Sequence, residues 1–370
     1  MSESVNAVPA FDYRRELSRC RAETDDAIRR VLDSGQLILG PEVQAFEHEF
    51  AAAIGVRHAV GVASGTDALI LALRALEIGS GHQVITVANT AVPTVSAIRA
   101  VGAQPRFAEI DGRTLQMCPV SLKDAVSSAT RCIIPVHLHG HPADMESIES
   151  IARTHSIPVI GDCAQAHGAA IGQRSVGTFG TISCYSFYPT KNLGAFGDGG
   201  MCVTDSEALA DRLKQQRQYG FRGDRTAHTD GVCSRLDELQ AAILRVRLRS
   251  LQTNQNKRTA IAERYCRGLA DCNAVLPVCT PDTTHAWHQF VIRVPNRSEL
   301  CDRLTQARIG FGIHYPVPIH RMPAYCNCGT ASGDLSNTER AADEILSLPM
   351  FPDLREEEVD RVISVIRAVC

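Results

Sequence analysis

The chain has 370 residues and a mass of 40.1 kDa, which is enough for two domains with sizeable cores. Apolar residues make up 44% and charged residues 21%, so the composition excludes a disordered protein. Lysine and arginine number 38 against 41 acidic residues. The resulting net charge of -3 gives no electrostatic footprint for nucleic acid or for an anionic membrane, so neither partner is expected.

The cysteines indicate a reducing compartment. Fourteen of them are scattered over the chain, and the first residues lack the basic and apolar segments of a secretory signal. We therefore expect free thiols and a cytoplasmic location. No apolar run reaches the roughly 18 residues of a membrane span. Cys326 and Cys328 are the closest pair, and no second pair or histidine cluster stands at zinc spacing, so no metal is expected.

The elements of the first half alternate between helix and strand. Two helices are predicted first, over residues 21–33 and 41–54. The short apolar runs that follow are predicted as buried strands over residues 58–63, 83–88, 106–110, 132–136, 158–161, 182–187 and 201–204. Helices are predicted between them over residues 68–76, 92–101, 122–127 and 145–155. This alternation predicts an α/β domain with a mostly parallel sheet.

The pattern changes after residue 205. Helices are predicted over residues 207–218, 236–251, 254–270, 299–307, 338–347 and 356–369, with one strand over residues 289–294. Between the last helices lies the proline-rich stretch HYPVPIHRMPAYCNCG. We place the domain boundary near residue 250, giving a large domain over residues 1–250 and a smaller α/β domain over residues 251–370.

The first candidate site is a turn at a helix start. The strand HAVGVA runs into Ser64, Gly65 and Thr66, and a helix begins at once. Free backbone N–H groups at such a helix start converge on one point, and phosphate is their usual ligand. On this segment alone, an ordinary helix cap, with Ser64 or Thr66 satisfying the helix start, is the favoured interpretation.

Two further candidates follow later strands. Asp162 ends the run PVIGD, at the edge where parallel sheets bind ligands, although a loop-capping aspartate is the alternative. Lys191 lies in the glycine-rich turn SFYPTKNLGAFGDGG, and it is a candidate Schiff-base amine; a solvated loop lysine is the alternative. A phosphate anchor, a carboxylate and a lysine, each after a strand, together match what pyridoxal phosphate requires of a protein.

At this point the sequence resembles the DegT/DnrJ/EryC1/StrS family of sugar aminotransferases, a branch of the fold-type-I pyridoxal-phosphate enzymes. The segments that carry the resemblance are SGTDALILALRAL, ITVANTAVPT, VGAQPRFAEID, GDCAQAHGA, SFYPTKNLGAFGDGG, SRLDELQAAILRVRL and HYPVPIH. They stand in family order over residues 35–320. The resemblance implies a mostly parallel seven-stranded central sheet with helices on both faces, and a homodimer with active sites at its interface.

The resemblance also implies roles for individual residues. Lys191 would carry the cofactor, and Asp162 would pair with the pyridine nitrogen. Gln165 would lie near the ring 3-hydroxyl. The phosphate would be held by Gly65, Thr66 and Ser186. Pyridoxamine phosphate would be the intermediate form in a ping-pong exchange with glutamate and 2-oxoglutarate.

Two positions depart from the family pattern. Cys233 stands where the family usually has an asparagine that reaches the cofactor phosphate across the dimer, and a thiol is a poor donor for phosphate. Ala91 stands nearest to the position of an aromatic residue that often stacks on the ring. We therefore do not transfer either role to this chain.

The lysine turn and the segment HYPVPIH look most like family members that aminate carbon 3 of a nucleotide-linked 3-keto-6-deoxyhexose, such as a dTDP sugar. Candidate substrate contacts are Tyr188, His314, Tyr315 and His320, with packing roles as the alternative. A nucleotide-sugar 4-aminotransferase and a keto-inositol aminotransferase remain alternatives. A sugar dehydratase is disfavoured by Lys191, and a regulatory protein without catalysis is disfavoured by the complete lysine and aspartate pair.

Two further patterns are expected to be structural. His137, His139 and His141 alternate in VHLHGH, but no carboxylate or cysteine accompanies them at metal-ligand spacing. Three arginines recur beside an apolar stripe, and we expect them to form a solvated face on a dimer-packing helix: Arg245, Arg247 and Arg249.

Overall fold

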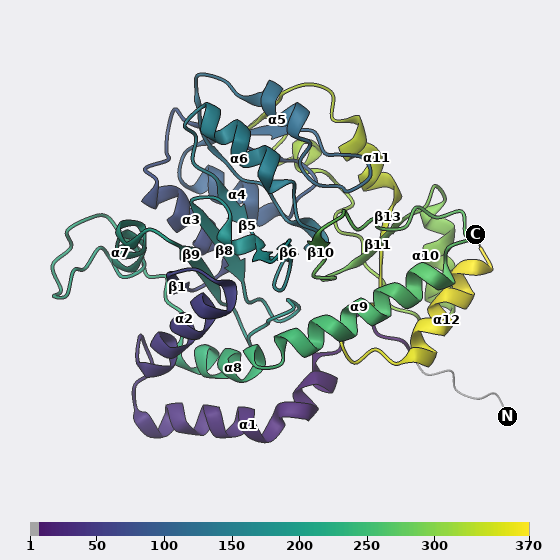
Figure 1. Cartoon of the computed structure of the whole chain (residues 1–370), viewed down its shortest axis with the longest axis horizontal. Coiled ribbons are helices and arrows are strands. Elements are labelled where there is room, and N and C mark those ends of the chain that lie inside the picture. Colours follow the sequence, from purple (N-terminus) through teal and green to yellow (C-terminus); the bar gives the residue numbers. More distant parts are fainter. Residues whose placement is uncertain (1–6, 370) are drawn as a thin grey trace.

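The computed structural model describes residues 7–369, and a mostly parallel sheet runs through its larger part (Figure 1). Two four-stranded pieces have the orders β1-β9-β8-β5 and β12-β3-β2-β4. Parallel bridges from Ile133 to Val159 and from Val136 to Asp162 join them. The strands are β1 (His58–Val62), β2 (Gln83–Val87), β3 (Gln104–Ala108), β4 (Thr130–Ile133), β5 (Ile160–Asp162), β8 (Ile182–Ser186), β9 (Gly200–Thr204) and β12 (Thr330–Ala331).

The expected mostly parallel α/β sheet is confirmed. Within it β9 runs antiparallel to both neighbours, β1 and β8, while the other pairings are parallel. The seven strands β1, β9, β8, β5, β4, β2 and β3 lie side by side, and the two-residue β12 from the C-terminal part extends the β3 edge. Since most strands run the same way, their carboxyl ends share one edge, and the polar candidates lie there.

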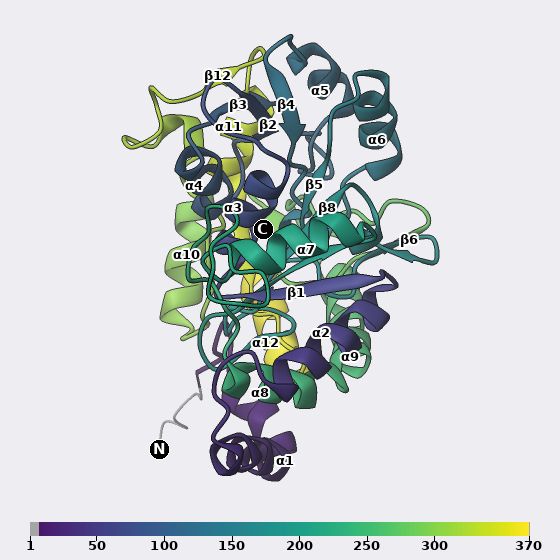
Figure 2. The same cartoon turned by 90° about the vertical axis from the view of Figure 1, so that its left-hand side faces the viewer.

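Helices cover both faces of this sheet. Their bounds are α1 (Tyr13–Ser34), α2 (Pro41–Ile54), α3 (Gly65–Ala75), α4 (Val92–Ala100), α5 (Pro119–Ala125), α6 (Met145–Thr154), α7 (Glu207–Gln216) and α8 (Glu238–Leu248). Strand β8 shows why both faces are apolar: Cys184 packs in the cluster that contains α3, whereas Tyr185 packs with Phe46 and Phe50 of α2. Figure 2 shows α1, α2 and α8 together below β1, and α5 and α6 at the opposite end, near β4.

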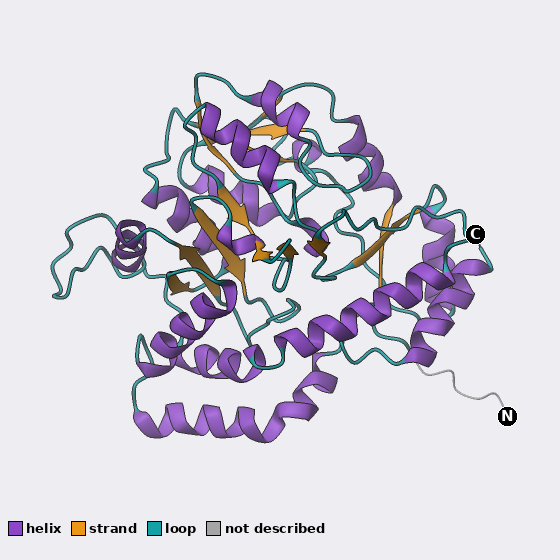
Figure 3. Ribbon diagram, in the orientation of Figure 1, coloured by secondary structure: helices purple, strands orange, loops and turns teal. Residues whose placement is uncertain are grey.

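The last third of the chain has a hydrophobic cluster of its own. It is built from α9 (Leu251–Gly268), β11 (Phe290–Arg293), α10 (Arg297–Gln306), β13 (Ile345–Leu348) and α12 (Glu356–Arg367), and Val8 from the other end of the chain joins it. In Figure 3, α8 and α9 follow one another above α1, the lowest helix in the view, and carry the chain into this part. This separate cluster supports our proposed boundary near residue 250. Residues 330–331 nevertheless return to the large sheet as β12.

Short elements complete the description: β6 (Ala170–Ile171), β7 (Arg174–Ser175), β10 (Thr283–Thr284), η1 (Leu138–Gly140), η2 (Val176–Thr178), η3 (Ile319–Arg321) and α11 (Ser336–Glu344). The helix predicted over residues 338–347 was wrong at its end, because β13 begins at residue 345 and pairs with β11 with all four residues buried. The first helix begins at Tyr13, eight residues before the prediction, where Asp12 caps it by accepting the Arg14 N–H. None of the helices described is long and apolar enough to cross a bilayer.

Candidate active site

Lys191 lies in the loop after β8 and is half-buried. Its backbone N–H donates to the carbonyl oxygen of Tyr188 at 2.8 Å, and the next residue, Asn192, ties the loop to Ala286 with a 2.7 Å hydrogen bond. Burial lowers the pKa of the Lys191 ammonium to about 8, and the negative charge of Asp162 opposes this shift. A lysine with this pKa is partly uncharged near neutral pH, and the uncharged amine is the form that attacks a carbonyl.

Asp162 is the last residue of β5, and 5% of it is exposed. Its Oδ2 accepts a hydrogen bond from the Thr94 hydroxyl at 2.8 Å, and its Oδ1 accepts from the Ala164 N–H at 3.1 Å. Burial raises the pKa of this carboxyl, while the two hydrogen bonds and the Lys191 charge oppose the rise. These bonds use two of about four acceptor positions, so the carboxylate can still accept a ring N–H.

The start of α3 and the end of β8 form a close-fitting cradle. A Cβ on Gly65 would lie 2.5 Å from the Cβ of Ser186, so a larger residue does not fit there. Ser64 caps the helix by accepting the Asp67 N–H, and within residues 7–369 no partner takes the N–H groups of Gly65 and Thr66. The Ser186 Oγ accepts the Tyr188 N–H at 3.3 Å, which leaves its hydroxyl proton for an anion.

Gln165 has a fixed side-chain orientation. Its Oε1 accepts the backbone N–H of His139 at 2.6 Å, and its Nε2 donates to the hydroxyl of Tyr315 at 3.2 Å. His139 has a left-handed backbone with φ of 62°, and its Nδ1 meets the side-chain oxygen of Gln289 at 2.8 Å. Because the oxygen of the amide is already engaged, Gln165 presents a hydrogen-bond donor to a ligand.

The candidate substrate residues are not all brought together. His314 and Tyr315 lie near the lysine. Burial is the main cause of the low pKa of His314, about 4, and the positive charge of Lys191 lowers it further. Tyr188 is 52% exposed on the lysine loop. His320 is engaged elsewhere, because its Nε2 meets Glu339 at 3.0 Å on the α11 side of the sheet.

Several contributors to the site were not predicted. Thr94 donates a hydrogen bond to Asp162, and Asn192 ties the lysine loop to Ala286. The Nδ1 of His288 meets the side-chain oxygen of Asn192 at 3.3 Å. A signal for Thr94 exists in the sequence, because a hydroxyl in the first turn after a strand lies at the ligand-binding edge. The segment around residue 288 offers no such signal, since it reaches the site through tertiary packing.

The two departures from the family pattern are visible as well. Cys233 is exposed on the loop after α7, and its Sγ accepts a hydrogen bond from the Arg235 guanidinium at 3.1 Å. Ala91 precedes α4 and has no ring to offer the cofactor.

The histidine run is buried rather than exposed. Burial lowers the pKa of His137 to about 3 and that of His139 to about 4, so both are neutral. Among the described residues no group of three or more His, Cys, Asp or Glu is arranged to hold a metal ion. The expectation of a solvated arginine face was wrong for Arg247: it is 5% exposed and binds Glu16 at 2.5 Å and the carbonyl of Gly194. The guanidinium of Arg247 can be buried because the Glu16 carboxylate balances its charge and the Gly194 carbonyl accepts one of its hydrogen bonds.

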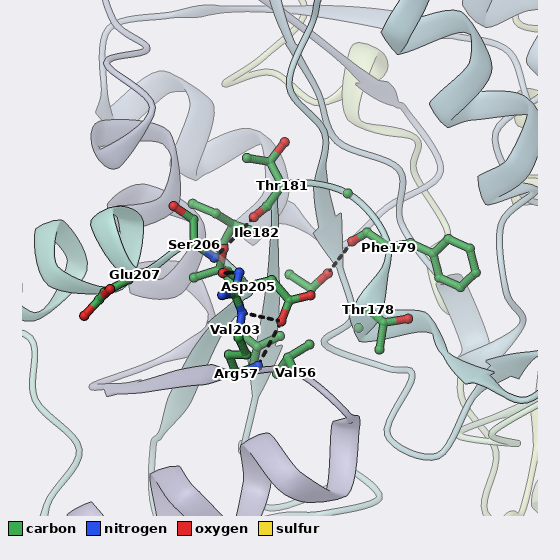
Figure 4. A pocket seen from close by; sticks show the side chains of 14 residues that line it. Val56, Arg57, Thr178, Phe179, Thr181, Ile182, Val203, Asp205, Ser206 and Glu207 are labelled. Atoms are coloured by element: carbon green, nitrogen blue, oxygen red, sulfur yellow. Dashed lines mark hydrogen bonds and ion pairs between the residues drawn. The ribbon is translucent and has the colours of Figure 1, made fainter.

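A cavity of about 520 Å³ lies away from these residues (Figure 4). Its lining includes Ile182, the first residue of β8, and Thr204, the last residue of β9. Ser186 lies at the other end of β8, so the cavity and the phosphate cradle are at opposite ends of these strands. The Asp205 carboxylate in it is already matched by Arg57, whose backbone N–H donates to it at 2.9 Å. The cavity therefore contributes nothing to the lysine site.

Three features at one edge of a mostly parallel sheet are typical of a pyridoxal-phosphate-dependent transferase: a lysine of lowered pKa, a buried aspartate and a helix start whose first N–H groups have no partner among the described residues. The chain belongs to the DegT/DnrJ/EryC1/StrS aminotransferase family, whose model matches residues 18–367. It is thus an aminotransferase that uses pyridoxal phosphate.

Individual relatives agree with this assignment. The chain is 45% identical, over 97% of its length and 95% of the relative's, to the dTDP-3-amino-3,4,6-trideoxy-alpha-D-glucose transaminase of Streptomyces venezuelae. It is 42% identical to the dTDP-3-amino-3,6-dideoxy-alpha-D-galactopyranose transaminase of Aneurinibacillus thermoaerophilus, over 97% and 98%. The crystal structure of S. venezuelae DesV with a ketimine intermediate matches with a TM-score of 0.96 at 44% identity, covering 98% of each chain. NtdA from Bacillus subtilis, with bound PMP, matches with a TM-score of 0.91 at 30% identity, covering 100% of this chain and 86% of NtdA.

The residues present fit this cofactor. The start of α3 packs closely against Ser186, and the N–H groups of Gly65 and Thr66, which take no partner within residues 7–369, suit a phosphate. A buried carboxylate with open acceptor positions suits a pyridinium nitrogen, and a lysine of lowered pKa suits an aldehyde.

Proposed function

We propose that this enzyme transfers an amino group from glutamate to carbon 3 of a nucleotide-linked keto-sugar, with a dTDP-3-keto-6-deoxyhexose as the preferred class. The single observation that carries the catalytic part is the Lys191 amine, whose pKa burial lowers to about 8 and the negative charge of the buried Asp162 carboxylate partly restores. Two relatives at 42–45% identity are named as dTDP-3-amino-sugar transaminases, which supports the substrate class. A UDP-sugar 3-aminotransferase of Acidithiobacillus ferrooxidans, at 42% identity, supports carbon 3 with a different nucleotide.

Each residue of the site has a proposed role. Bound pyridoxal phosphate supplies an electron sink conjugated to the amino group that is transferred. The N–H groups of Gly65 and Thr66 and the hydroxyl of Ser186 bind its phosphate. Asp162 holds the proton on the pyridine nitrogen, and Gln165 donates to the ring 3-oxygen. Lys191 binds the aldehyde and afterwards, as a free amine, moves a proton at its Nζ.

The sugar is proposed to lie against the His314–Tyr315 corner. Tyr315 is anchored by Gln165 at 3.2 Å, and His314 is anchored by the Ser347 hydroxyl at 2.8 Å. Tyr188, half exposed beside the lysine, completes one wall. His320, which Glu339 already engages, is the weakest of the four proposed contacts.

We further propose a cytoplasmic homodimer with active sites at its interface. Several large apolar side chains are exposed, and a second copy would cover them: Leu37, Ile38, Tyr188 and Tyr219 are 44–52% exposed. The thirteen described cysteines are all free, which suits a reducing compartment. Light scattering of the purified protein gives the mass, and a monomer at micromolar concentration would contradict the dimer.

The test of the function is isotope transfer. Purified enzyme, ¹⁵N-glutamate and a dTDP-3-keto-6-deoxyhexose are expected to give a ¹⁵N-labelled 3-amino sugar, identified by NMR. The corresponding 4-keto sugar and a keto-inositol, run in parallel, are expected to react far more slowly. The Lys191→Ala variant is the control for background exchange.

One alternative has support of its own. Relatives at 40–42% identity carry the names "Pleiotropic regulatory protein" and "Erythromycin biosynthesis sensory transduction protein EryC1". A regulator would need no amine of lowered pKa beside a carboxylate, so the Lys191 and Asp162 pair favours catalysis. Absence of labelled product with all three ketones, despite cofactor binding, would favour the regulatory alternative.

A further inference from the structure

Two buried threonines are joined to Asp162 by a chain of hydrogen bonds. Thr90 follows β2, and Thr94 stands in the first turn of α4; each is 1% exposed. The Thr94 hydroxyl lies 2.8 Å from Oδ2 of Asp162 and 2.9 Å from the Thr90 hydroxyl. None of the roles proposed above uses either residue.

The direction of these hydrogen bonds follows from the number of protons. An ionised carboxylate only accepts, so the single hydroxyl proton of Thr94 points to Asp162. Thr94 is then the acceptor toward Thr90, and Thr90 is the donor. The result is a one-way chain from Thr90 to Thr94 to Asp162, in which each bond polarises the next.

The carboxylate needs this support because of its surroundings. Lys191 is the cation that faces it, and Tyr315, Cys163 and Cys184 face it as weak acids whose pKa values are raised by burial. None of these three acids is ionised near neutral pH. When Lys191 gives up its proton, its stabilisation of the Asp162 charge is lost, and the hydrogen bonds from Thr94 and the Ala164 N–H remain.

We propose that Thr94 is a positioning residue for the cofactor: its hydroxyl holds the Asp162 carboxylate ionised and oriented toward the pyridine nitrogen, with Thr90 as the donor behind it. The proposal rests on pyridoxal phosphate as the cofactor and is independent of the sugar. It also gives the 90–94 segment a way to act on the cofactor although Ala91 offers no stacking ring. The segment then acts through the carboxylate, by way of two hydroxyls that meet at 2.9 Å.

The test compares Thr94→Val with Thr94→Ser. Valine keeps the shape and removes the donor, whereas serine keeps the donor. Since a hydrogen bond to a charged group is involved, we expect Thr94→Val to weaken pyridoxal phosphate binding to the apoprotein by roughly 10- to 100-fold, measured by equilibrium dialysis. Serine is expected to restore most of the affinity. Without the donor the pKa of Asp162 rises. As the pH is lowered, the affinity of Thr94→Val is therefore expected to begin to fall at a higher pH than the affinity of the wild type.

A matched control separates positioning from packing. Thr86 is equally buried on β2, and its hydroxyl donates to the Ile134 carbonyl oxygen at 2.9 Å, away from Asp162. Thr86→Val is expected to lose stability without any change in cofactor affinity or in its pH profile. If Thr94→Val does not fold, as judged by circular dichroism, Thr90→Val serves instead, with a smaller loss expected.

The outcomes distinguish this proposal from the function itself. An unchanged affinity and pH profile in a folded Thr94→Val, or a loss that serine does not restore, would overturn the positioning role. Failure of the wild-type apoprotein to bind pyridoxal phosphate would instead overturn the proposed cofactor roles.

Discussion

Gln165 and Tyr315 lie 150 residues apart in the sequence, and the side-chain amide of the first donates to the hydroxyl of the second at 3.2 Å. The other end of the amide is held by the backbone N–H of His139 at 2.6 Å. One side chain therefore links the loop after β5, which is proposed to approach the cofactor ring, to the segment proposed to bind the sugar. Removing one hydrogen bond of Gln165 at a time tests the two halves of the site separately.

The first prediction removes the tyrosine hydroxyl. Tyr315→Phe loses one hydrogen bond between neutral groups, which costs about 1 kcal/mol, or roughly fivefold. We expect KM for the keto-sugar to rise by about that factor, while the dissociation constant of pyridoxal phosphate stays within about twofold, because His139 still orients Gln165. Steady-state kinetics and cofactor dialysis measure the two quantities. Tyr325→Phe, outside the site, is the control, and a loss confined to cofactor binding would contradict the assignment.

The second prediction concerns the phosphate cradle. Gly65→Ala would place a methyl group 2.5 Å from the Cβ of Ser186, so backbone must shift at the start of α3. Overpacking of this kind costs about 1–3 kcal/mol, and it moves the N–H groups that bind phosphate. We expect cofactor affinity to fall by at least tenfold, together with a lower Tm of the apoprotein. Gly79→Ala, whose Cβ would meet its nearest atom at 3.4 Å, is expected to change neither.

The third prediction concerns the pH dependence of cofactor capture. Because burial lowers the pKa of Lys191 from 10.5 to about 8, the uncharged amine becomes the major form above pH 8. The rate at which apoprotein attaches pyridoxal phosphate is therefore expected to rise with pH through a midpoint near 8 and then to level off. Borohydride fixation followed by mass spectrometry measures attachment at Lys191. A midpoint near the ordinary lysine value of 10.5 would show that burial does not tune the amine.

Sequence reasoning reached the sheet and the main residues of the site for a definable reason. Gly65 comes shortly after β1, Asp162 ends β5, and Lys191 lies in the loop after β8; parallel strands deliver their carboxyl ends to one edge. The apolar runs were short enough to be distinguished from helices by length, so the strand order was the main unknown.

The parts that sequence reasoning missed depend on distant segments. The strand β13 was predicted as helix because its four buried residues extend a helical pattern, and its pairing with β11 is a tertiary fact. Arg247 was predicted as solvated because nothing local shows that Glu16, 231 residues away, meets it. Asn192 and Ala286 likewise join through a contact that neither segment indicates by itself.

The fourth prediction concerns the tie between the two ends of the chain. Glu358, in the first turn of α12, accepts two hydrogen bonds from Arg15 of α1, at 2.7 and 2.8 Å, and two from Arg355, whose guanidinium and backbone N–H each donate at 2.9 Å. Burial opposes ionisation, but these bonds outweigh it and lower the pKa of Glu358 from 4.5 to about 2. Glu358→Gln is expected to reduce the free energy of unfolding by about 2 kcal/mol at neutral pH, since a charged acceptor is lost.

The pH dependence of this difference is the sharper test. A carboxyl whose pKa is lower in the folded than in the unfolded state stabilises the fold fully above the unfolded value, here 4.5, and progressively less as pH falls toward 2. The gap in unfolding free energy between wild type and Glu358→Gln should therefore be constant above about pH 5 and shrink below it, as denaturant titrations would measure. Glu356→Gln on the same helix removes an ion pair to Arg264 in which the glutamate side chain is 81% exposed, and it is expected to change little at any pH. A gap that did not vary with pH would show that Glu358 acts through shape, because only the charge of the carboxylate responds to protons in this range.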